Sequence, residues 1–367
     1  MIELLTNILD GVKIIDLTRY YSGPFCTLTL ADLGADVLKI EHPSGDETRA
    51  YPPFTENGNS AYFATFNRGK RSRVLDLKNN NHLKILLSLI KQADVVVENF
   101  GSDKLDELGL SYEAISNENP RIILASLKAS SDKEILGFDL CVQAMSGIMD
   151  LNHIHNVPQP LPIAFADGMS GIMTTVGILS ALYNCLKSGK GQHIKIYMLD
   201  TYLAMMEHMV TVNANTDILN ESDISPITPY GTFKAKDGYF VLAVGNENQW
   251  SNLVSATNGV LDKWKSYSNL QRIDEKQCID EAISLWAKSK NVTDIVKILQ
   301  SFKIPGSRVN TVKQALEMKL TDPDFLVSAK WRNGDKMTFP SLPIRFAESR
   351  KKISVIPDLG QDDEFEW

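Results

Sequence analysis

The sequence predicts an α/β protein with a Rossmann-like parallel sheet, joined to a smaller α+β domain. Short β-branched runs alternate with helical patterns over the first 130 residues, which is typical of parallel βαβ units. A stretch rich in Asn, Asp, Ser and Pro at 213–229 interrupts this pattern and predicts a linker. The 367 residues are enough for two domains.

The predicted elements follow in order along the chain. A helix at 24–33 begins with Pro24 in its first turn, where proline is favoured. A second helix is expected near 82–92, and a Met-rich helix follows the last strand, through Tyr202 to Met209. The expected strands lie at 12–17, 36–41, 72–78, 94–100, 121–128 and 193–199.

Beyond the linker the pattern changes. Residues 230–244 predict a hairpin with Asp237-Gly238 at its turn, and helices are expected near 250–256, 275–288 and 293–302. The sequence therefore predicts a large domain at 1–212, a linker at 213–229 and a small α+β domain at 230–322.

Composition limits the classes of partner. The 38 basic and 45 acidic residues give a net charge of -7, which argues against nucleic acid. Four cysteines without C-x-x-C spacing favour reduced residues of a cytoplasmic protein. The N-terminus has no basic region typical of a secretory signal. Residues 168–186 form the one apolar stretch long enough for a membrane span, but its Thr and Ser content favours a core helix.

Several common site motifs are absent from the sequence. The first strand-to-helix turn, RYYSGPF, has one glycine instead of G-x-G-x-x-G, and neither a phosphate-binding P-loop nor a G-x-S-x-G elbow occurs. His153 and His155 have no third ligand nearby, so no metal site is predicted. One basic cluster is either a solvated face or a phosphate-accepting surface; its members are Arg68, Lys70, Arg71, Arg73 and Lys78.

Asp167 is the most informative single residue. It stands at the head of an apolar stretch with no other charge before Lys187, so a helix buried inside the large domain is expected. The carboxylate is either the cap of that helix or a reagent that the helix N-terminus keeps ionised. Gly168 and Gly171 remove bulk from the first turn, which would let a ligand approach the backbone.

Taken together, the motifs resemble the family III CoA-transferases, which include formyl-CoA transferase and, as close relatives, α-methylacyl-CoA racemase. The resemblance extends over nearly the whole chain, through LADLGADVLKIEHPSGDETR, FNRGKRSRVLDLK, ADVVVENF, GKGQHIKIYMLD and IPGSRVNTVKQAL. It implies a large domain built from both chain ends, with 323–367 as the return linker and C-terminal part. It also implies a homodimer of interlocked subunits.

The resemblance places the family's catalytic aspartate at Asp167. It implies transfer of CoA from an acyl-CoA to a small carboxylic acid through covalent aspartyl intermediates. CoA is then a substrate, with no permanently bound cofactor and no metal. The positions that match CoA contacts in the family are Tyr21, His42, Leu75, Lys78, Asn99, Lys104, Leu108 and Phe138.

Departures from the family pattern bear on CoA binding and on the reaction. His42 replaces an arginine found in many members, and Tyr21 replaces a glutamine of the pocket. Glu107 also replaces an arginine, for which Lys104 is the expected substitute. Phe138 stands where the racemases have a histidine, which favours transferase over racemase because racemisation needs two bases.

The glycine-rich lid of formyl-CoA transferase is absent, and GNENQW, with Gly245 and Glu247, is the nearest replacement. Two alternatives stay open at this point. One is a racemase or isomerase of α-substituted acyl-CoA that pairs Asp167 with Glu247, and the other is a CoA-binding protein without catalysis.

Overall fold

The computed structural model describes residues 7–101, 103–135, 137–215, 226–318, 322–346 and 355–367. The chain divides into two compact units, which are Met1–Met206 with Pro323–Trp367, and Glu207–Asp322. Each unit is described by itself.

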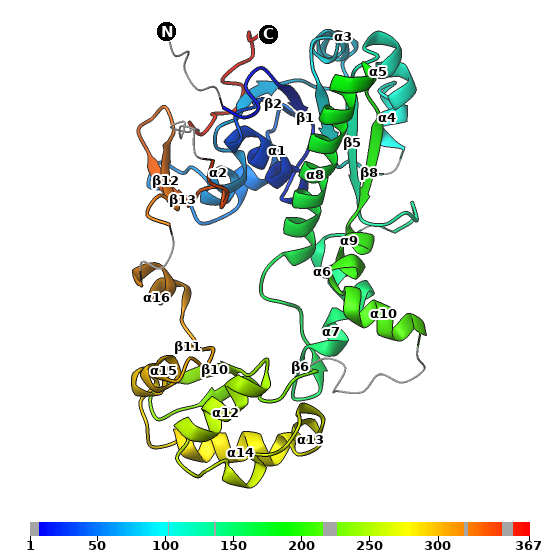
Figure 1. The fold of residues 1–367 in the computed structure, drawn as a ribbon. Coiled ribbons are helices and arrows are strands. Elements are labelled where there is room, and N and C mark those ends of the chain that lie inside the picture. The colour runs from blue at the N-terminus through cyan, green and yellow to red at the C-terminus, as the bar shows by residue number, and fades with distance from the viewer. Residues whose placement is uncertain (1–6, 102, 136, 216–225, 319–321, 347–354) are drawn as a thin grey trace, which may run out of the picture. The chain divides into compact units, whose positions relative to one another are not determined.

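A six-stranded parallel sheet forms the centre of the first unit, in the order β3-β2-β1-β4-β5-β8 (Figure 1). The predicted α/β class with a parallel sheet is thus confirmed. The strands are β1 (Lys13–Asp16), β2 (Asp36–Glu41), β3 (Arg71–Val74), β4 (Val95–Glu98), β5 (Ile123–Lys128) and β8 (His193–Tyr197).

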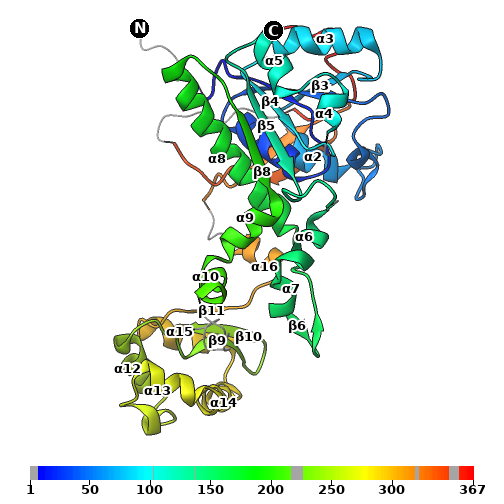
Figure 2. The same ribbon diagram turned by 90° about the vertical axis from the view of Figure 1, so that its right-hand side faces the viewer.

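Helices cover both faces of this sheet (Figures 1 and 2). Successive strand residues point to opposite faces, so Ile14 packs with α1 (Ser22–Asp32) and α8 (Phe165–Ser188), whereas Ile15 packs with α3 (Asn80–Ile90) and α5 (Tyr112–Glu118). The remaining elements of this part are η1 (Glu47–Ala50), α2 (Ala61–Asn67), α4 (Lys104–Glu107), α6 (Asp139–Ser146), α7 (Ile148–Leu151), β6 (His153–Ile154), β7 (Val157–Pro158) and α9 (Met198–Met205).

The third predicted strand is shorter than expected, because β3 ends at Val74 instead of Lys78. Side-chain hydrogen bonds turn the chain there: Asp76 accepts from the backbone N–H of Lys78, and Asn79 caps α3 by accepting from the N–H groups of Asn81 and His82.

The C-terminal segment returns to the first unit and covers the edge strand β3. It forms the hairpin of β12 (Leu326–Lys330) and β13 (Lys336–Pro340). Asp362 donates its N–H to the Ser72 carbonyl and accepts the Ser72 N–H, while Asp363 accepts the N–H of Val74. These bonds use backbone groups that an open sheet edge would leave unpaired.

α8 does not lie wholly inside the domain, so the prediction of a buried helix is wrong for one of its faces. Ile178 and Ala181 are buried against α1 and the sheet, because only that face meets other elements. Among the described residues, α8 is the one helix long and apolar enough to cross a membrane. Its exposed apolar side chains are Ile172, Met173, Val176, Tyr183 and Leu186.

The second unit contains a three-stranded antiparallel sheet in the order β11-β10-β9, with helices packed around a core that includes Trp250 and Phe240. The Met-rich segment is two helices rather than one, because the chain leaves helical geometry at Met206. The elements of this unit are α10 (Glu207–Asn215), β9 (Tyr230–Lys234), β10 (Tyr239–Ala243), α12 (Glu247–Ala256), η2 (Asp262–Trp264), α13 (Asn269–Asp274), α14 (Lys276–Ala287), α15 (Val292–Ser301), β11 (Gly306–Arg308) and α16 (Val312–Glu317).

Candidate active site at the N-terminus of α8

Asp167 is the third residue of α8 and does not cap it. The N-cap position, Ala164, offers no side-chain hydrogen bond. The cap comes instead from α6, where Asp139 Oδ1 accepts the backbone N–H groups of Ala166 at 2.7 Å and Asp167 at 3.2 Å. The cap interpretation of Asp167 is therefore wrong, and its carboxylate is left for other partners.

Ser22, the first residue of α1, is one of those partners. Its hydroxyl and its backbone N–H face the Asp167 carboxylate and favour the ionised form of that group. Gly171 makes this approach possible, because a Cβ at that position would lie 2.7 Å from the Ser22 carbonyl oxygen. The expected role of Gly171 in ligand approach is thus replaced by close packing of α8 on α1. Gly168 faces the Tyr21 hydroxyl, 3.6 Å from where its Cβ would be.

The surroundings of Asp167 make its carboxylate unusually basic. Burial is the largest cause and the negative charge of Asp139 the next, and together they raise the pKa from the ordinary 3.8 to about 6. The Ser22 hydroxyl and backbone N–H act in the opposite direction. A carboxylate with such a pKa is ionised at neutral pH and is more nucleophilic than an exposed aspartate.

Aromatic side chains line the same region. The Tyr21 and Phe66 rings lie 4.2 Å apart between centroids, and Tyr62 is 5.2 Å from Phe66 and 5.5 Å from Tyr51. Burial and the charge of Asp167 raise the pKa of Tyr62 to about 12. Its phenol therefore remains protonated and is a hydrogen-bond donor at neutral pH.

Buried charges hold the loop that leads to Ser22. Lys70 Nζ donates to Asp16 Oδ2 at 2.9 Å and to the Pro24 carbonyl at 3.0 Å, while Lys39 Nζ donates to the Thr18 carbonyl at 2.7 Å. Burial would raise the pKa of Asp16, but the two lysines and the nearby threonine hydroxyls outweigh it and hold the pKa well below its usual range.

The positions predicted to contact CoA all follow the carboxyl ends of successive strands. Tyr21 comes after β1, and His42 comes after β2. Leu75 and Lys78 come after β3, the set of Asn99, Lys104 and Leu108 comes after β4, and Phe138 comes after β5. In open parallel sheets, ligands bind at this edge. Contacts connect two of these positions with the loop that leads to Ser22. Tyr20 packs edge-on against Phe138 at 5.5 Å, and the Asn99 amide both accepts from and donates to the Arg19 backbone.

Some of these side chains already have partners inside the protein. Leu75 is 3% exposed, and Leu108 packs against the same core. Lys104 forms an ion pair with Glu107 at 2.8 Å. His42 is exposed and its Nδ1 lies 2.7 Å from the Ser44 hydroxyl.

The basic cluster around β3 is mostly occupied internally. Arg68 pairs with Asp32, Lys70 with Asp16, Arg71 with Asp36, and Arg73 donates to the Phe365 carbonyl. Arg68, Lys70 and Arg73 are buried, so both interpretations of the cluster, as a solvated face or as a phosphate-accepting surface, are wrong for these three residues, whereas the Arg71 side chain is 42% exposed. Lys78 remains exposed.

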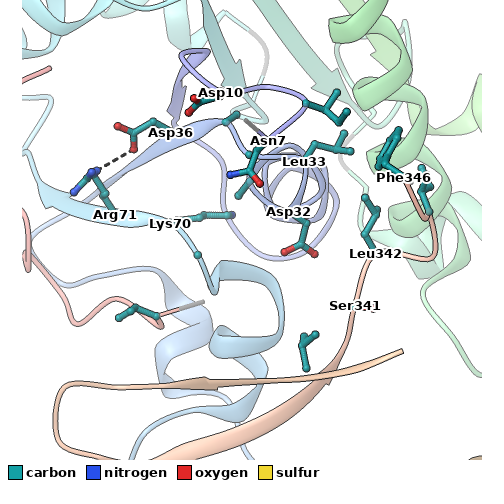
Figure 3. A pocket seen from close by; sticks show the side chains of 18 of the residues that line it. Asn7, Asp10, Asp32, Leu33, Asp36, Lys70, Arg71, Ser341, Leu342 and Phe346 are labelled. Atoms are coloured by element: carbon teal, nitrogen blue, oxygen red, sulfur yellow. Dashed lines mark hydrogen bonds and ion pairs between the residues drawn. The ribbon is translucent and has the colours of Figure 1, made fainter. Parts of the chain in front are cut away.

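A cavity of about 800 Å³ lies elsewhere in the same unit (Figure 3). Lys13, Asp36 and Arg71 line it, and these residues begin β1, β2 and β3. It is therefore at the amino edge of the sheet, opposite the edge at which Ser22 follows β1. Segments 1–6 and 347–354, which adjoin its lining, lie outside the described residues. The cavity is not part of the Asp167 site.

Two residues of the site, Ser22 and Asp139, escaped the sequence analysis. Ser22 precedes Asp167 by 145 positions, so no local pattern connects them. Asp139 gave a weak signal, as an acid at the start of a helix. No group of three or more His, Cys, Asp or Glu suited to a metal ion occurs in the described part of the chain.

Comparisons with known proteins show the family of the chain. A family model described as CoA-transferase family III matches residues 9–363. A succinate–glutarate CoA-transferase of Agrobacterium fabrum is 33% identical over 83% of this chain and 81% of its own length. A succinyl-CoA:mesaconate CoA-transferase of Haloarcula hispanica is 29% identical over 93% of this chain and 90% of its own length. The crystal structure of a CAIB/BAIF family protein from Brucella suis superposes with a TM-score of 0.83, at 31% identity and 98% coverage of both chains. The chain belongs to CoA-transferase family III, and it is an enzyme of that family.

Proposed function

We propose that the protein transfers CoA from a dicarboxylic acyl-CoA to a free carboxylic acid, with Asp167 as the covalent nucleophile. The observation that carries this proposal is the state of Asp167, which is not used as a helix cap, is held by Ser22 and has its pKa raised to about 6. The names of the succinate–glutarate and succinyl-CoA:mesaconate relatives support the substrate class.

The proposed reaction balances without water or ATP. An Asp167 carboxylate oxygen attacks the thioester carbonyl, the C–S bond breaks, and the CoA thiolate leaves a mixed anhydride. The thiolate then attacks the Asp167 carbonyl carbon and expels the donor acid as its carboxylate. The acceptor carboxylate attacks the aspartyl thioester and releases CoA thiolate again. The thiolate finally attacks the acceptor's acyl carbon, which yields the new acyl-CoA and restores Asp167.

CoA binding is proposed along the carboxyl edge of the sheet, at Tyr21, His42, Leu75, Lys78, Asn99, Lys104, Leu108 and Phe138. The place of all eight positions after the strands supports this. Leu75, because it is buried, would contact CoA through its backbone. The Lys104–Glu107 ion pair reduces the positive charge that Lys104 can offer a phosphate.

A homodimer is part of the proposal. The apolar face of α8 supports it, because Val176, Tyr183 and Leu186 are 50%, 61% and 77% exposed in the single chain, and such a face is typical of a protein interface. The cytoplasm is the proposed compartment, since all four cysteines are free.

The racemase alternative is less well supported. Besides Phe138 in place of histidine, its second base Glu247 accepts two hydrogen bonds from Arg272, at 2.8 and 3.0 Å. The Arg272 hydrogen bonds lower the pKa of Glu247, so this carboxylate is a weak base. The alternative of a CoA-binding protein without catalysis does not explain why the pKa of Asp167 is raised.

Trapping of the intermediate tests the proposal. The protein is incubated with succinyl-CoA and a mixture of carboxylic acids, new acyl-CoAs are identified by mass, and borohydride or hydroxylamine is added to trap the aspartyl thioester. We expect a modified Asp167, and loss of exchange in Asp167→Asn but not in the control Asp150→Asn on exposed α7.

Full exchange by Asp167→Asn, with no deamidation, would refute the covalent role. Deuterium incorporation at the α-carbon without an acceptor would favour the racemase. Tight CoA binding without exchange across a panel of donors would favour the binding protein.

A further inference from the structure

Asp139 has no part in the proposed chemistry, yet it is built firmly into the site. It is 8% exposed and stands at the first position of α6. One oxygen receives the Ala166 and Asp167 N–H groups, and the other accepts from Gln143 Nε2 at 2.6 Å. Gln143 in turn accepts the N–H of Leu161 at 2.8 Å, so the pair also fixes the segment that leads into α8.

We propose that Asp139 is a positioning residue for CoA transfer: its carboxylate holds the first turn of α8 from outside the helix and places a negative charge beside the Asp167 carboxylate. This inference rests on the proposed function of Asp167. It assigns two effects to one group, and asparagine separates them because its Oδ1 can still accept the two backbone N–H groups without carrying a charge, although it loses the Gln143 hydrogen bond.

The charge effect depends on what else faces Asp167. Ser22 and Tyr21 approach from the start of α1, Tyr62 from α2, and Asp139 from α6. The two tyrosines are neutral at physiological pH, since the pKa of each is raised by burial and by Asp167. Among the described residues, no lysine or arginine shifts the pKa of Asp167. Asp139 is therefore the one charge in this set that opposes ionisation of the nucleophile.

A basic nucleophile suits this exchange. In the first step the Asp167 carboxylate attacks a thioester. In the later steps the donor carboxylate is displaced from the Asp167 carbonyl carbon, and the acceptor carboxylate attacks that carbon. A carboxylate whose pKa lies above that of an ordinary acid attacks faster, because nucleophilicity rises with basicity. It still remains ionised at neutral pH.

The test measures the titration of Asp167 without using activity. The free energy of unfolding is determined from pH 4 to 8 with and without Asp167→Asn, first in the wild-type background and then in Asp139→Asn. The difference between each pair reports the ionisation of Asp167, and any general loss of stability from Asp139→Asn cancels. The slope of this difference against pH falls to zero as Asp167 ionises in the folded protein, and we expect the midpoint of that fall near pH 6 in the wild type and lower in the Asp139→Asn background.

Asp150→Asn on α7 is the matched control, because it removes the same charge at an exposed position, and the midpoint should not move. In the Asp139→Asn variant, the acid limb of the pH profile of kcat/KM should shift to lower pH, in the same direction as the midpoint. Asp139→Ala, which loses both the cap and the charge, should lower kcat more than Asp139→Asn at every pH.

An equal midpoint in the Asp139→Asn and Asp150→Asn backgrounds would overturn the inference. That outcome differs from failure of the proposed function. If Asp167 were not the nucleophile, Asp167→Asn would stay active while the unfolding midpoints still moved.

Discussion

Gly171 of α8 lies directly against the backbone carbonyl of Ser22. A Cβ at position 171 would stand 2.7 Å from that oxygen and 3.1 Å from the Phe25 ring. The glycine thus lets the start of α1 pack closely on α8, one turn after Asp167 in the same helix. Backbone closeness between two helices, and not space for a ligand, explains this glycine.

Gly171→Ala should therefore lower kcat while leaving the fold intact. The added methyl group pushes Ser22 away from the Asp167 carboxylate, and displacements of about 1 Å at a reacting group cost about 10- to 100-fold in rate. Gly177→Ala in the same helix is the control. Its Cβ would meet only the flexible end of Ile194, at 3.1 Å, and alanine favours helix by about 0.5 to 1 kcal/mol. Equal kcat values for the two variants would contradict the argument.

Lys70→Met should destabilise the protein and disturb the loop before Ser22. It leaves Asp16 buried without its closest cation and frees the Pro24 carbonyl, and removing one partner of a buried ion pair costs about 3 to 5 kcal/mol. The measurement is urea-induced unfolding at pH 7. Lys91→Met is the control, since Lys91 forms a surface pair with Glu118, 53% and 50% exposed, and such pairs contribute less than about 1 kcal/mol. A similar loss in both variants would show that the buried network does not stabilise the loop.

The sequence predicted the sheet well because the signal is local. The strand at Asp36–Glu41 has the predicted bounds, since a continuous apolar run between turn residues fits a buried strand. β3 ended early because Asp76 and Asn79 form side-chain hydrogen bonds that compete with the strand. Short side chains with this ability make strand ends hard to predict from hydrophobicity alone.

The candidate site could be predicted only where a residue could be identified by itself. Asp167 was singled out because it is a single charge in an apolar stretch. Ser22 and Asp139 reach it from α1 and α6, and sequence spacing contains no information about which distant loops meet. The exposed face of α8 was also missed, because an apolar helix has the same composition whether it is covered by its own chain or by a partner.

Asp167→Asn should stabilise the protein above pH 6. The folded protein holds the Asp167 proton up to a pKa of about 6, whereas the unfolded chain releases it near 3.8. The folded state therefore binds more protons between these values, and the stabilisation present below pH 3.8 is lost as the pH rises through 6. Asparagine does not show this loss, so the variant should gain about 3 kcal/mol at pH 7.5 and little at pH 4. Denaturant unfolding at both pH values checks this, and a gain that does not depend on pH would contradict it.

Val176→Glu should convert the proposed dimer to monomers. Val176 lies in the middle of the exposed apolar face of α8, between Met173 and Tyr183, and is 50% exposed in the single chain. Burying an unpaired carboxylate in an apolar interface costs several kcal/mol, which is enough to dissociate a dimer at micromolar concentration. Light scattering after size exclusion gives the mass directly. Leu285→Glu is the control, because Leu285 is 71% exposed on α14 in the other unit. A dimer that survives Val176→Glu unchanged would place the interface on another surface, and a monomeric wild type would remove the proposal altogether.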